Sequence, residues 1–365
     1  MLAERLQRLV VETGPISVAR YMTLALTHPA GGYYCGRDPF GRSGDFVTAP
    51  EISQVFGELI GLVLAQSWLE MGRPSRIGLV ELGPGRGTLL TDAMRAARVV
   101  PGFLAAAELH LVETSPVLRA RQATALAAAS VSWHGELATV PPDLPLLLVA
   151  NEFLDALPIR QFVRHRGRWH ERLIAVDDVG GFRFVLAGRA TPFPHNPNDG
   201  WDDLADGTVL ELGPARDALA QQIAARIVAQ GGLALIVDYG RAATAMLGDT
   251  LQAVREHRVV DPLLSPGEAD LSADVDFAAL RSSARAAGAV AWGPLTQAKY
   301  LDRLGIWRRL ARLTERATPE QREMLEQGCA RLVGPDAMGE RFKVLAITAS
   351  DAPIPAGFLD GEQRA

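Results

Sequence analysis

The spacing of hydrophobic and polar positions in this chain changes near residue 76. Before that point, apolar residues recur at helical spacing over residues 2–11 and about 17–27, and residues 51–71 are apolar nearly all round. Such spacing predicts helices, and a helix that is apolar on most sides is expected to be buried. We therefore expect residues 1–75 to form an N-terminal helical cap, with a Gly-rich loop over residues 31–50.

Beyond residue 76, short apolar runs alternate with helical segments. The runs cover residues 77–82, 108–112, 131–134, 144–150, 233–237, 289–292 and 342–348. Short apolar runs between helices indicate a buried, mainly parallel sheet with helices on both faces. The chain is therefore expected to be an α/β protein with a doubly wound, mainly parallel seven-stranded sheet, built from residues 76–158 and 213–350.

Two segments interrupt this alternation. Residues 159–212 contain four strand-like runs separated by turn signals, which predict a β-rich insertion. Residues 296–332 have helical spacing and predict a helical extension beyond the sheet. A short echo of the glycine motif described below, ELGPAR at 211–216, is interpreted as a strand-to-helix turn with Pro214 at the first helical position.

Composition narrows the class of protein. The 365 residues are 48% hydrophobic and 22% charged, and the net charge of −5 argues against broad nucleic-acid binding. No apolar run approaches ~18 residues, so no transmembrane helix is expected. Residues 1–10 carry charges at short intervals and have no apolar core, so no signal peptide is expected and the cytoplasm is the predicted location. Cys35 and Cys329 belong to no cluster of metal-ligand spacing, so no metal is expected.

Candidate chemistry begins at the glycine-rich segment ELGPGRG, residues 81–87. Gly83, Gly85 and Gly87 lie between a predicted strand and a predicted helix, where backbone N–H groups can bind polar ligand atoms. The third glycine comes one residue too early for a dinucleotide fingerprint, and the P-loop lysine is missing. This pattern, with Glu81 before it, is that of class I methyltransferases and predicts S-adenosyl-L-methionine as cofactor.

Two further acids follow the next predicted strands. Glu113 ends the run at 108–112, at the place where a carboxylate accepts both ribose hydroxyls. Glu136 follows the run at 131–134, where adenine would lie, although a solvated loop acid is an open alternative. Both acids are predicted to bind cofactor.

A second motif, NEFLDALP at 151–158, follows the fourth predicted strand, whose carboxyl end should open into the site. Asn151 is expected to contact the cofactor. Glu152 and Asp155 are predicted to be catalytic, because carboxylates beside a methyl donor can grip a guanidinium and orient its nitrogen. The open alternative is that these acids cap a helix over residues 153–157.

Four segments in this order resemble the MidA-type family, which includes the mitochondrial complex I assembly methyltransferases. They are GDFVTAPEIS at 44–53, ELGPGRG at 81–87, NEFLDALP at 151–158 and DLSADVDF at 270–277. The resemblance implies a class I methyltransferase that symmetrically dimethylates an arginine in a complex I (NADH dehydrogenase) subunit, and hence a protein substrate. Asp274 departs from the family pattern, which has His there, so its role is open.

The remaining candidates surround these motifs. The segment at 44–53 is expected to fold over the cofactor as a lid, with Thr48 and Gln54 near the cofactor and Asp45 and Glu51 near the substrate. Tyr239, which follows the run at 233–237, is predicted to line the substrate channel. Alternatives remain: Thr48 and Glu51 could be a helix-capping pair, and Tyr239 an ordinary strand-end aromatic.

Some questions stay open at this level. Asp270, Asp274 and Asp276 could touch substrate, or Asp274 could cap a helix. A small-molecule methyltransferase, a methyltransferase for another residue, and a non-catalytic assembly protein remain alternative functions, because fold does not fix substrate. The oligomeric state is undetermined.

Overall fold

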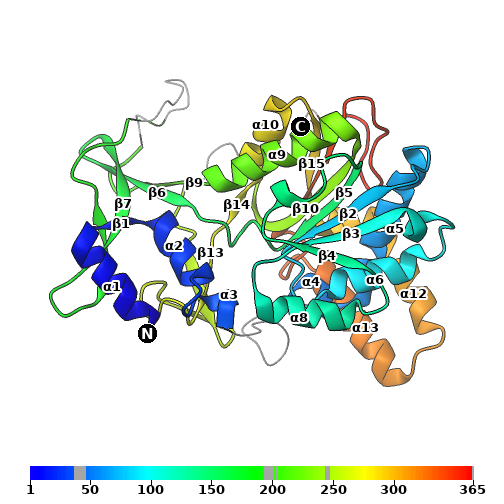
Figure 1. Cartoon of the computed structure of the whole chain (residues 1–365), viewed down its shortest axis with the longest axis horizontal. Helices are drawn as coiled ribbons and strands as arrows, with labels where there is room; N and C mark the ends of the chain where they lie inside the picture. The colour runs from blue at the N-terminus through cyan, green and yellow to red at the C-terminus, as the bar shows by residue number, and fades with distance from the viewer. Residues whose placement is uncertain (37–46, 193–200, 202–203, 243–246, 364–365) are drawn as a thin grey trace.

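The computed structural model describes residues 1–36, 47–192, 201, 204–242 and 247–363, so Asp45 lies outside the described residues. Figure 1 shows two lobes: a larger one built on a central sheet, and a smaller one that contains the N-terminal helices and the strands of the insertion. The N-terminus lies in the smaller lobe and the C-terminus in the larger.

The central sheet contains all seven predicted runs. Its strands follow the order β15-β16-β10-β5-β2-β3-β4, and the short β14 pairs with β10. They are β2 (Ile77–Leu82), β3 (Ala107–Val112), β4 (Val131–His134), β5 (Leu146–Asn151), β10 (Gly232–Arg241), β14 (Val275–Asp276), β15 (Val290–Thr296) and β16 (Phe342–Thr348). The strands from β10 to β4 are parallel, whereas β16 is antiparallel to both β10 and β15. The predicted α/β fold with a mainly parallel sheet is confirmed.

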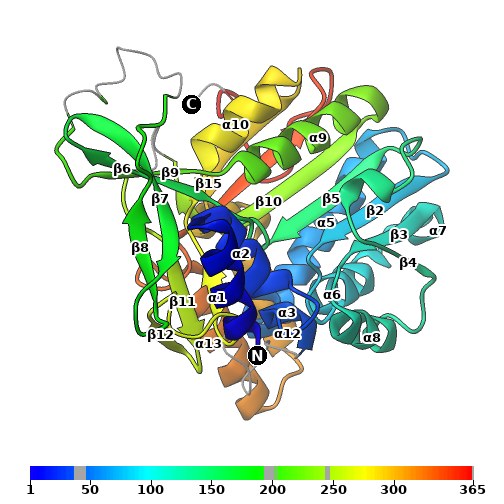
Figure 2. The same ribbon diagram turned by 60° about the vertical axis from the view of Figure 1, so that its left-hand side comes forward.

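The strands are apolar on both faces because each face packs against helices. Neighbouring residues alternate between two hydrophobic clusters: Leu79 belongs to the first, and Val80 to the second. The first cluster includes α5 (Gln54–Glu70) and α6 (Thr88–Ala97), and the second α9 (Pro214–Gln230) and α10 (Phe277–Ala286). Figure 2 shows these helix pairs on opposite sides of the sheet. At Gly61 of α5, a Cβ atom would come within 2.3 Å of the Ala93 carbonyl oxygen, so the contact with α6 requires glycine.

The long helix predicted over residues 51–71 is interrupted. The structure has a short α4 (Ala49–Ile52), then Ser53 in an extended conformation with φ −154°, then α5. The Ser53 hydroxyl accepts a hydrogen bond from the Val55 N–H at 3.3 Å, so a new helix begins there. The break turns α4 away from the line of α5 and toward the glycine-rich segment.

The smaller lobe joins the N-terminal helices to the insertion. The strands β6 (Arg160–His165), β7 (Arg168–Val176), β8 (Phe182–Leu186) and β9 (Val209–Leu212) form one sheet with β1 (Ile16–Ser17). The helices α1 (Leu2–Thr13) and α2 (Val18–Thr27) share a hydrophobic cluster with Ile174 of β7 and with Leu271 of β13 (Asp270–Ser272). Residues 1–27 therefore pack mainly against the insertion, whereas α5 packs against the central sheet. The domain boundaries of the sequence analysis stay a prediction.

A third, small sheet was not predicted. It consists of β12 (Arg258–Val260), β11 (Gln252–Arg255) and β13 (Asp270–Ser272). Its strands are only three or four residues long, so they give a weak periodic signal. The sheet lies between α2 and the carboxyl end of β10, beside the candidate site.

The short helix α3 (Tyr33–Gly36) packs against α2, and its Tyr33 belongs to the hydrophobic cluster of the smaller lobe. The remaining helices flank the larger lobe: α7 (Phe103–Ala106), α8 (Pro116–Ala125), the 3-10 turn η1 (Leu137–Thr139), α11 (Gln297–Leu304), α12 (Ile306–Thr314) and α13 (Pro319–Val333). The last three form the predicted helical extension. Glu58 of α5 is only 1% exposed in its side chain and pairs with Arg95 at 2.9 Å and Arg309 at 2.7 Å, which joins α5, α6 and α12.

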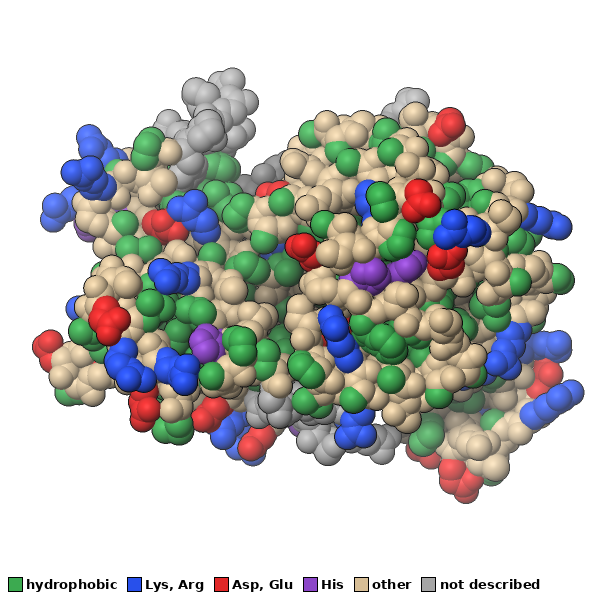
Figure 3. All heavy atoms as spheres, viewed as in Figure 1, with side chains coloured by type: hydrophobic (Ala, Val, Ile, Leu, Met, Phe, Trp, Pro, Cys, Tyr) green, Lys and Arg blue, Asp and Glu red, His purple; other side chains and the backbone are tan. Residues whose placement is uncertain are grey.

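The surface carries charges of both signs. Figure 3 shows Lys and Arg side chains gathered over the left-hand end of the β6–β7 hairpin, where Arg166 and Arg168 are exposed, and mixed charges elsewhere on this face. Within the described part of the chain, no helix has both the length and the apolar character needed to cross a membrane.

Candidate active site

The glycine-rich segment forms the turn between β2 and α6. Gly83, Gly85 and Gly87 have φ angles of 61°, 52° and 81°, a region that side-chain-bearing residues rarely adopt. At Gly83 a Cβ atom would also lie 2.5 Å from Cδ2 of Phe153. The segment is therefore closely packed against the second motif, and the two predicted motifs form one site.

A small cavity opens over this turn. It is lined by Thr48, Pro50, Glu51, Glu81, Gly83, Pro84, Gly85, Arg86, Thr88, Leu89, Asn151 and Glu152. Glu81 and Asn151 are buried, and no hydrogen-bond partner for Glu81 Oε2 or Asn151 Oδ1 is found among the described residues. Burial raises the pKa of Glu81 to about 8. Two buried acceptors without donors fit a ligand that brings an ammonium group, as the amino-acid part of S-adenosyl-L-methionine does.

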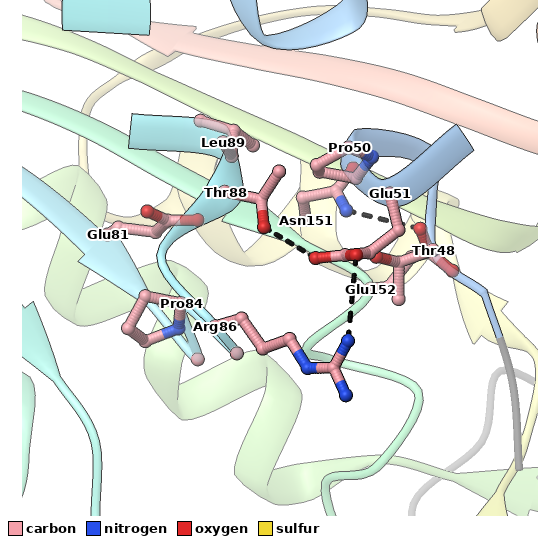
Figure 4. Close-up of a pocket in the computed structure, with 12 residues that line it drawn as sticks. Thr48, Pro50, Glu51, Glu81, Pro84, Arg86, Thr88, Leu89, Asn151 and Glu152 are labelled. Atoms are coloured by element: carbon pink, nitrogen blue, oxygen red, sulfur yellow. Dashed lines mark hydrogen bonds and ion pairs between the residues drawn. The ribbon is translucent and has the colours of Figure 1, made fainter. Parts of the chain in front are cut away.

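Of the predicted lid residues that the structure describes, Thr48 and Glu51 line this cavity, whereas Gln54 does not. Figure 4 shows Glu51 accepting a hydrogen bond from Thr88, with an Oγ1–Oε1 distance of 2.5 Å, and an ion pair with Arg86 at 3.9 Å. Thr48 is the N-cap residue of α4 but makes no side-chain cap, so the alternative of a capping pair with Glu51 is not formed. Gln54 directs its amide toward Glu58 Oε1 at 3.5 Å, along α5.

A second cavity lies on the other side of the glycines. Its lining residues are Leu26, Thr27, Tyr34, Gly83, Gly85, Glu113, Leu118, Glu152, Phe153, Ala156 and Leu157. The carboxylate of Glu113 accepts from Ser115 N–H at 2.8 Å and from the Gln122 amide at 3.2 Å, and burial raises its pKa. Glu113 therefore lines a cavity together with Gly83 and Gly85, and its role as the ribose acid stays a prediction. Glu136 is exposed at the start of η1, away from the residues that line this cavity.

Gln122 is a site residue that the sequence analysis missed. It is fully buried on α8, donates to the Gly85 carbonyl oxygen at 2.8 Å and to Glu113, and accepts from the indole N–H of Trp133 at 2.9 Å. One amide thus fixes the glycine turn relative to the acid and to β4. A single glutamine in a helical segment gives no signal of such a role.

The second motif forms a turn, with no helix over residues 153–157, so the helix-capping alternative is not formed. Glu152 has φ 49°, an uncommon conformation for a residue other than glycine. The buried Asp238 of β10 holds the turn, because its Oδ2 accepts from the N–H groups of residues 153, 154 and 155 at 3.2, 2.9 and 3.2 Å. The sequence analysis singled out its neighbour Tyr239 but not Asp238.

The echo motif also supports this turn. Gly213 is the N-cap residue of α9 and Pro214 its first residue, which confirms the interpretation of residues 211–216 as a strand-to-helix turn. Arg216 is buried and donates to the carbonyl oxygens of Asp155 at 2.9 Å, Ala273 at 3.1 Å and Asp274 at 2.6 Å. The guanidinium therefore connects the second motif to the segment at 270–277.

A third cavity, of about 330 Å³, is acidic and partly aromatic. It is lined by Tyr34, Glu152, Asp155, Tyr239, Gln252, Val254, Asp270, Ser272, Arg341 and Phe342. Glu152 lines all three cavities, so it lies where the glycine side of the site meets the acidic pocket. Tyr239 also lines this pocket, and its role in a substrate channel stays a prediction.

The carboxylates of this pocket are buried and partly satisfied. Glu152 Oε1 accepts from Ala49 N–H at 2.8 Å and from Asn151 at 3.2 Å, and burial raises the pKa of Glu152 to about 7. Burial also raises the pKa of Asp155, against the opposing effect of a hydrogen bond from Tyr239. Asp270 accepts from the Tyr34 hydroxyl at 2.8 Å. Three carboxylates and three aromatic rings make a pocket that suits a planar cation.

The neighbouring acids have other roles. Asp276 Oδ1 accepts from Ala279 N–H at 2.9 Å and caps α10, so the helix cap considered for Asp274 belongs to Asp276. Asp274 instead pairs with Arg241 at 3.5 Å and lies 3.9 Å from Arg341.

Comparison with known proteins identifies the family of this chain. Residues 59–295 match the model of a family described as putative S-adenosyl-L-methionine-dependent methyltransferase. A mitochondrial protein arginine methyltransferase NDUFAF7 homolog of Drosophila melanogaster is 40% identical, over 95% of this chain and 84% of its own. The mitochondrial protein arginine methyltransferase NDUFAF7 of Homo sapiens is 38% identical, over 93% and 81%.

Among solved structures, the chain is similar to a methyl transferase candidate from Burkholderia thailandensis that was crystallised bound to S-adenosyl-homocysteine. The TM-score is 0.84 and the sequence identity 28%, with 99% of this chain and 95% of that chain covered. Its native crystal form gives a TM-score of 0.79 at 29% identity. A chain with this fold therefore binds the demethylated product of the cofactor predicted here.

The comparisons correct one expectation. Residues 1–10 led to a predicted cytoplasmic location, whereas the curated relatives from fly, fish and human are named as mitochondrial proteins. The cytoplasmic prediction is therefore wrong. A targeting segment is independent of the fold, so the residue pattern near the start of the chain was a poor guide to location.

Proposed function

This chain belongs to the family of S-adenosyl-L-methionine-dependent methyltransferases, and on that premise we propose that it methylates arginine side chains of a protein. The observation that carries the proposal is the position of Glu152, which lines both cavities beside the glycines and also the acidic pocket. Methyl transfer needs donor and acceptor in close, aligned contact, and Glu152 lies where the two would meet.

The residues proposed to hold the cofactor divide into two groups. Glu81 and Asn151 would accept hydrogen bonds from its ammonium group, with Thr48 and Glu51 closing that side. Glu113 would accept from the ribose hydroxyls, on the other side of Gly83 and Gly85. When bound, the cofactor supplies an electrophilic methyl group on a sulfonium sulfur.

The acidic pocket is proposed to hold the acceptor guanidinium. The carboxylates of Glu152 and Asp155 would orient one nitrogen toward the glycine side, and the ring of Tyr239 would stack on the guanidinium plane. As the new N–C bond forms and the S–C bond breaks, the methylated nitrogen must lose a proton. A Glu152 carboxylate with a pKa of about 7 is suited to accept that proton.

The protein substrate is proposed from the relatives. Those from fly and human are named protein arginine methyltransferases, and they match more than nine tenths of this chain. Together with the family motifs, this supports symmetric dimethylation of an arginine in a complex I subunit. The sequence similarity to these relatives extends over nearly the whole chain and was not inferred from the acidic pocket, so it supports the proposal independently.

The test is methyl transfer from labelled donor to peptides that span the surface arginines of complex I subunits. Mass spectrometry of the product distinguishes monomethylarginine from symmetric and asymmetric dimethylarginine. We expect label on arginine, lost in Glu152→Gln and retained in the exposed control Glu136→Gln. Label on no arginine, while calorimetry shows bound cofactor, would exclude this function.

A further inference from the structure

The acidic pocket already contains a guanidinium of the chain itself. Arg341, immediately before β16, lines the pocket together with Asp155 and Asp270. Its guanidinium carbon lies 4.9 Å from the centre of the Tyr239 ring, whose other neighbour, Phe342, lies edge-on at 5.7 Å between ring centres. The Arg341 side chain is 57% exposed, so it reaches the ring from the mouth of the pocket.

The position of Arg341 conflicts with an acceptor in the same pocket. A guanidinium binds best where it meets both a carboxylate and the face of an aromatic ring, and Tyr239 is the aromatic residue next to Asp155 here. Two cations on this ring would repel each other at short range. An incoming guanidinium must therefore displace Arg341 from Tyr239.

Asp274 is a nearby carboxylate with which the displaced Arg341 side chain could form an ion pair. Arg341 Nη2 lies 3.9 Å from Asp274 Oδ1, too long for a strong ion pair, and Asp274 already pairs with Arg241 at 3.5 Å. Lys343 also lies close enough for the Asp274 charge to act on its pKa, although burial lowers that pKa overall. Asp274 thus lies close to three cationic side chains, of which Arg341 lines the acidic pocket, whereas Asp274 itself lines another cavity.

We propose that Arg341 is a gate that determines specificity in the acceptor pocket: it occupies the face of Tyr239 while the pocket is empty, and moves toward Asp274 when a substrate guanidinium enters. This inference rests on the proposed function. It implies that small guanidines, which bring few other contacts, bind poorly, whereas an arginine in a protein has additional contacts that offset the displacement. The gate therefore selects protein acceptors over free arginine.

The test replaces Arg341 by Met, which keeps an unbranched apolar stem and removes the charged group, and by Lys, which keeps the charge. The matched control is Arg258→Met, which removes one charge from an exposed residue of β12. Two quantities are measured with cofactor bound: the Kd for methylguanidine by calorimetry, and kcat and KM for an arginine peptide. The side chain is largely exposed, so folding should be unaffected, which a melting curve checks.

For Arg341→Met we expect methylguanidine to bind about two- to fivefold more tightly, with a similar fall in KM and little change in kcat. Arg341→Lys and Arg258→Met should stay near the wild type. A KM or Kd that is unchanged in Arg341→Met would overturn the gate, and a weaker affinity would show instead that Arg341 binds the acceptor. If no arginine peptide is methylated but methylguanidine binding tightens as expected, the proposed function fails and the gate stands.

Discussion

The two halves of the candidate site differ in how far their polar groups are already satisfied. On the cofactor side, Glu81 and Asn151 each keep a buried acceptor with no donor among the described residues. In the acidic pocket, Asp270 accepts from Tyr34, Asp155 from Tyr239, and Arg341 lies over the Tyr239 ring. The cofactor side is therefore prepared for a ligand, whereas the acceptor side must exchange internal contacts for those of the substrate.

The same contrast appears in the sequence distance over which each half is assembled. The glycine turn and Glu81 come from seven consecutive residues, 81–87, whereas the acidic pocket takes residues from Tyr34 to Phe342. The shape of a short local segment can be determined by its own backbone conformation. A pocket built from distant segments depends on the sheet, on Asp238 and on Arg216 to hold its parts together.

The largest expected effect is on the acceptor side, in Glu152→Gln. The amide keeps an oxygen that can accept from Ala49 N–H, so the turn should remain folded. It loses the charge that orients the guanidinium, so kcat/KM should fall about 10²- to 10³-fold. Cofactor affinity should change little, because the donor contacts lie with Glu81, Asn151 and Glu113. A cofactor Kd that weakened as much as kcat/KM would erase the distinction between the two halves.

Gly83→Ala should have the opposite effect to Glu152→Gln, because it should mainly weaken cofactor binding. Gly87→Ala is the matched control, because both glycines have a positive φ angle and only the Cβ at 83 would meet Phe153, at 2.5 Å. At Gly87 the nearest atoms lie at an ordinary 3.7 Å. We expect cofactor binding to weaken about 100-fold in Gly83→Ala and much less in Gly87→Ala. Equal losses, measured by calorimetry, would show that backbone strain alone decides and that the contact with Phe153 is unimportant.

The sequence predicted what is local and missed what depends on tertiary contacts. All seven strands of the central sheet and the glycine turn were predicted, because apolar runs and closely spaced glycines are local signals. The break at Ser53 was missed because the apolar residues Ile52, Val55, Phe56 and Leu59 keep helical spacing across it. Asp238, Gln122 and Arg216 were missed because an isolated polar residue carries no periodicity, and their roles exist only once distant segments meet.

Gln122 gives a smaller test of how the cofactor side is held. Gln122→Leu has a similar volume but leaves the Gly85 carbonyl, one Glu113 oxygen and the Trp133 N–H without this partner. Each unsatisfied buried group costs about 1–3 kcal/mol, so stability should fall by a few kcal/mol and cofactor affinity about tenfold. Thr124→Ala, on the exposed side of α8, is the control. Chemical denaturation and calorimetry give the two quantities.

Measuring acceptor binding in Gln122→Leu also tests whether the two halves of the candidate site respond independently. Among the described residues, the Gln122 side chain is hydrogen-bonded to Gly85, Glu113 and Trp133, none of which lines the acidic pocket, so the methylguanidine Kd should stay within about twofold of the wild type. A parallel loss of guanidine affinity would mean that the glycine turn and the acidic pocket respond as one unit.

The smallest expected effect concerns the proton on Glu81. Burial raises its pKa from 4.5 to about 8, so the folded protein without ligand retains this proton at pH 7 and the unfolded chain does not. The folded state thus binds more protons between about pH 4.5 and 8, and the free energy of unfolding should fall as pH rises through that window. Glu81→Gln cannot ionise and should show a flatter dependence, measured by denaturation at several pH values.

Cofactor binding should show the opposite trend with pH, because the proposed ammonium contact favours the ionised carboxylate. With a pKa of about 8 in the free protein, affinity should rise about fivefold between pH 7 and pH 8, as a proton is released from Glu81 on binding. The amino group of the cofactor titrates in a nearby range, but it does so equally with wild type and Glu81→Gln, so the difference between the two curves isolates Glu81. Parallel curves would mean that the ammonium does not reach this carboxylate, and that the unsatisfied acceptor on the cofactor side serves another group.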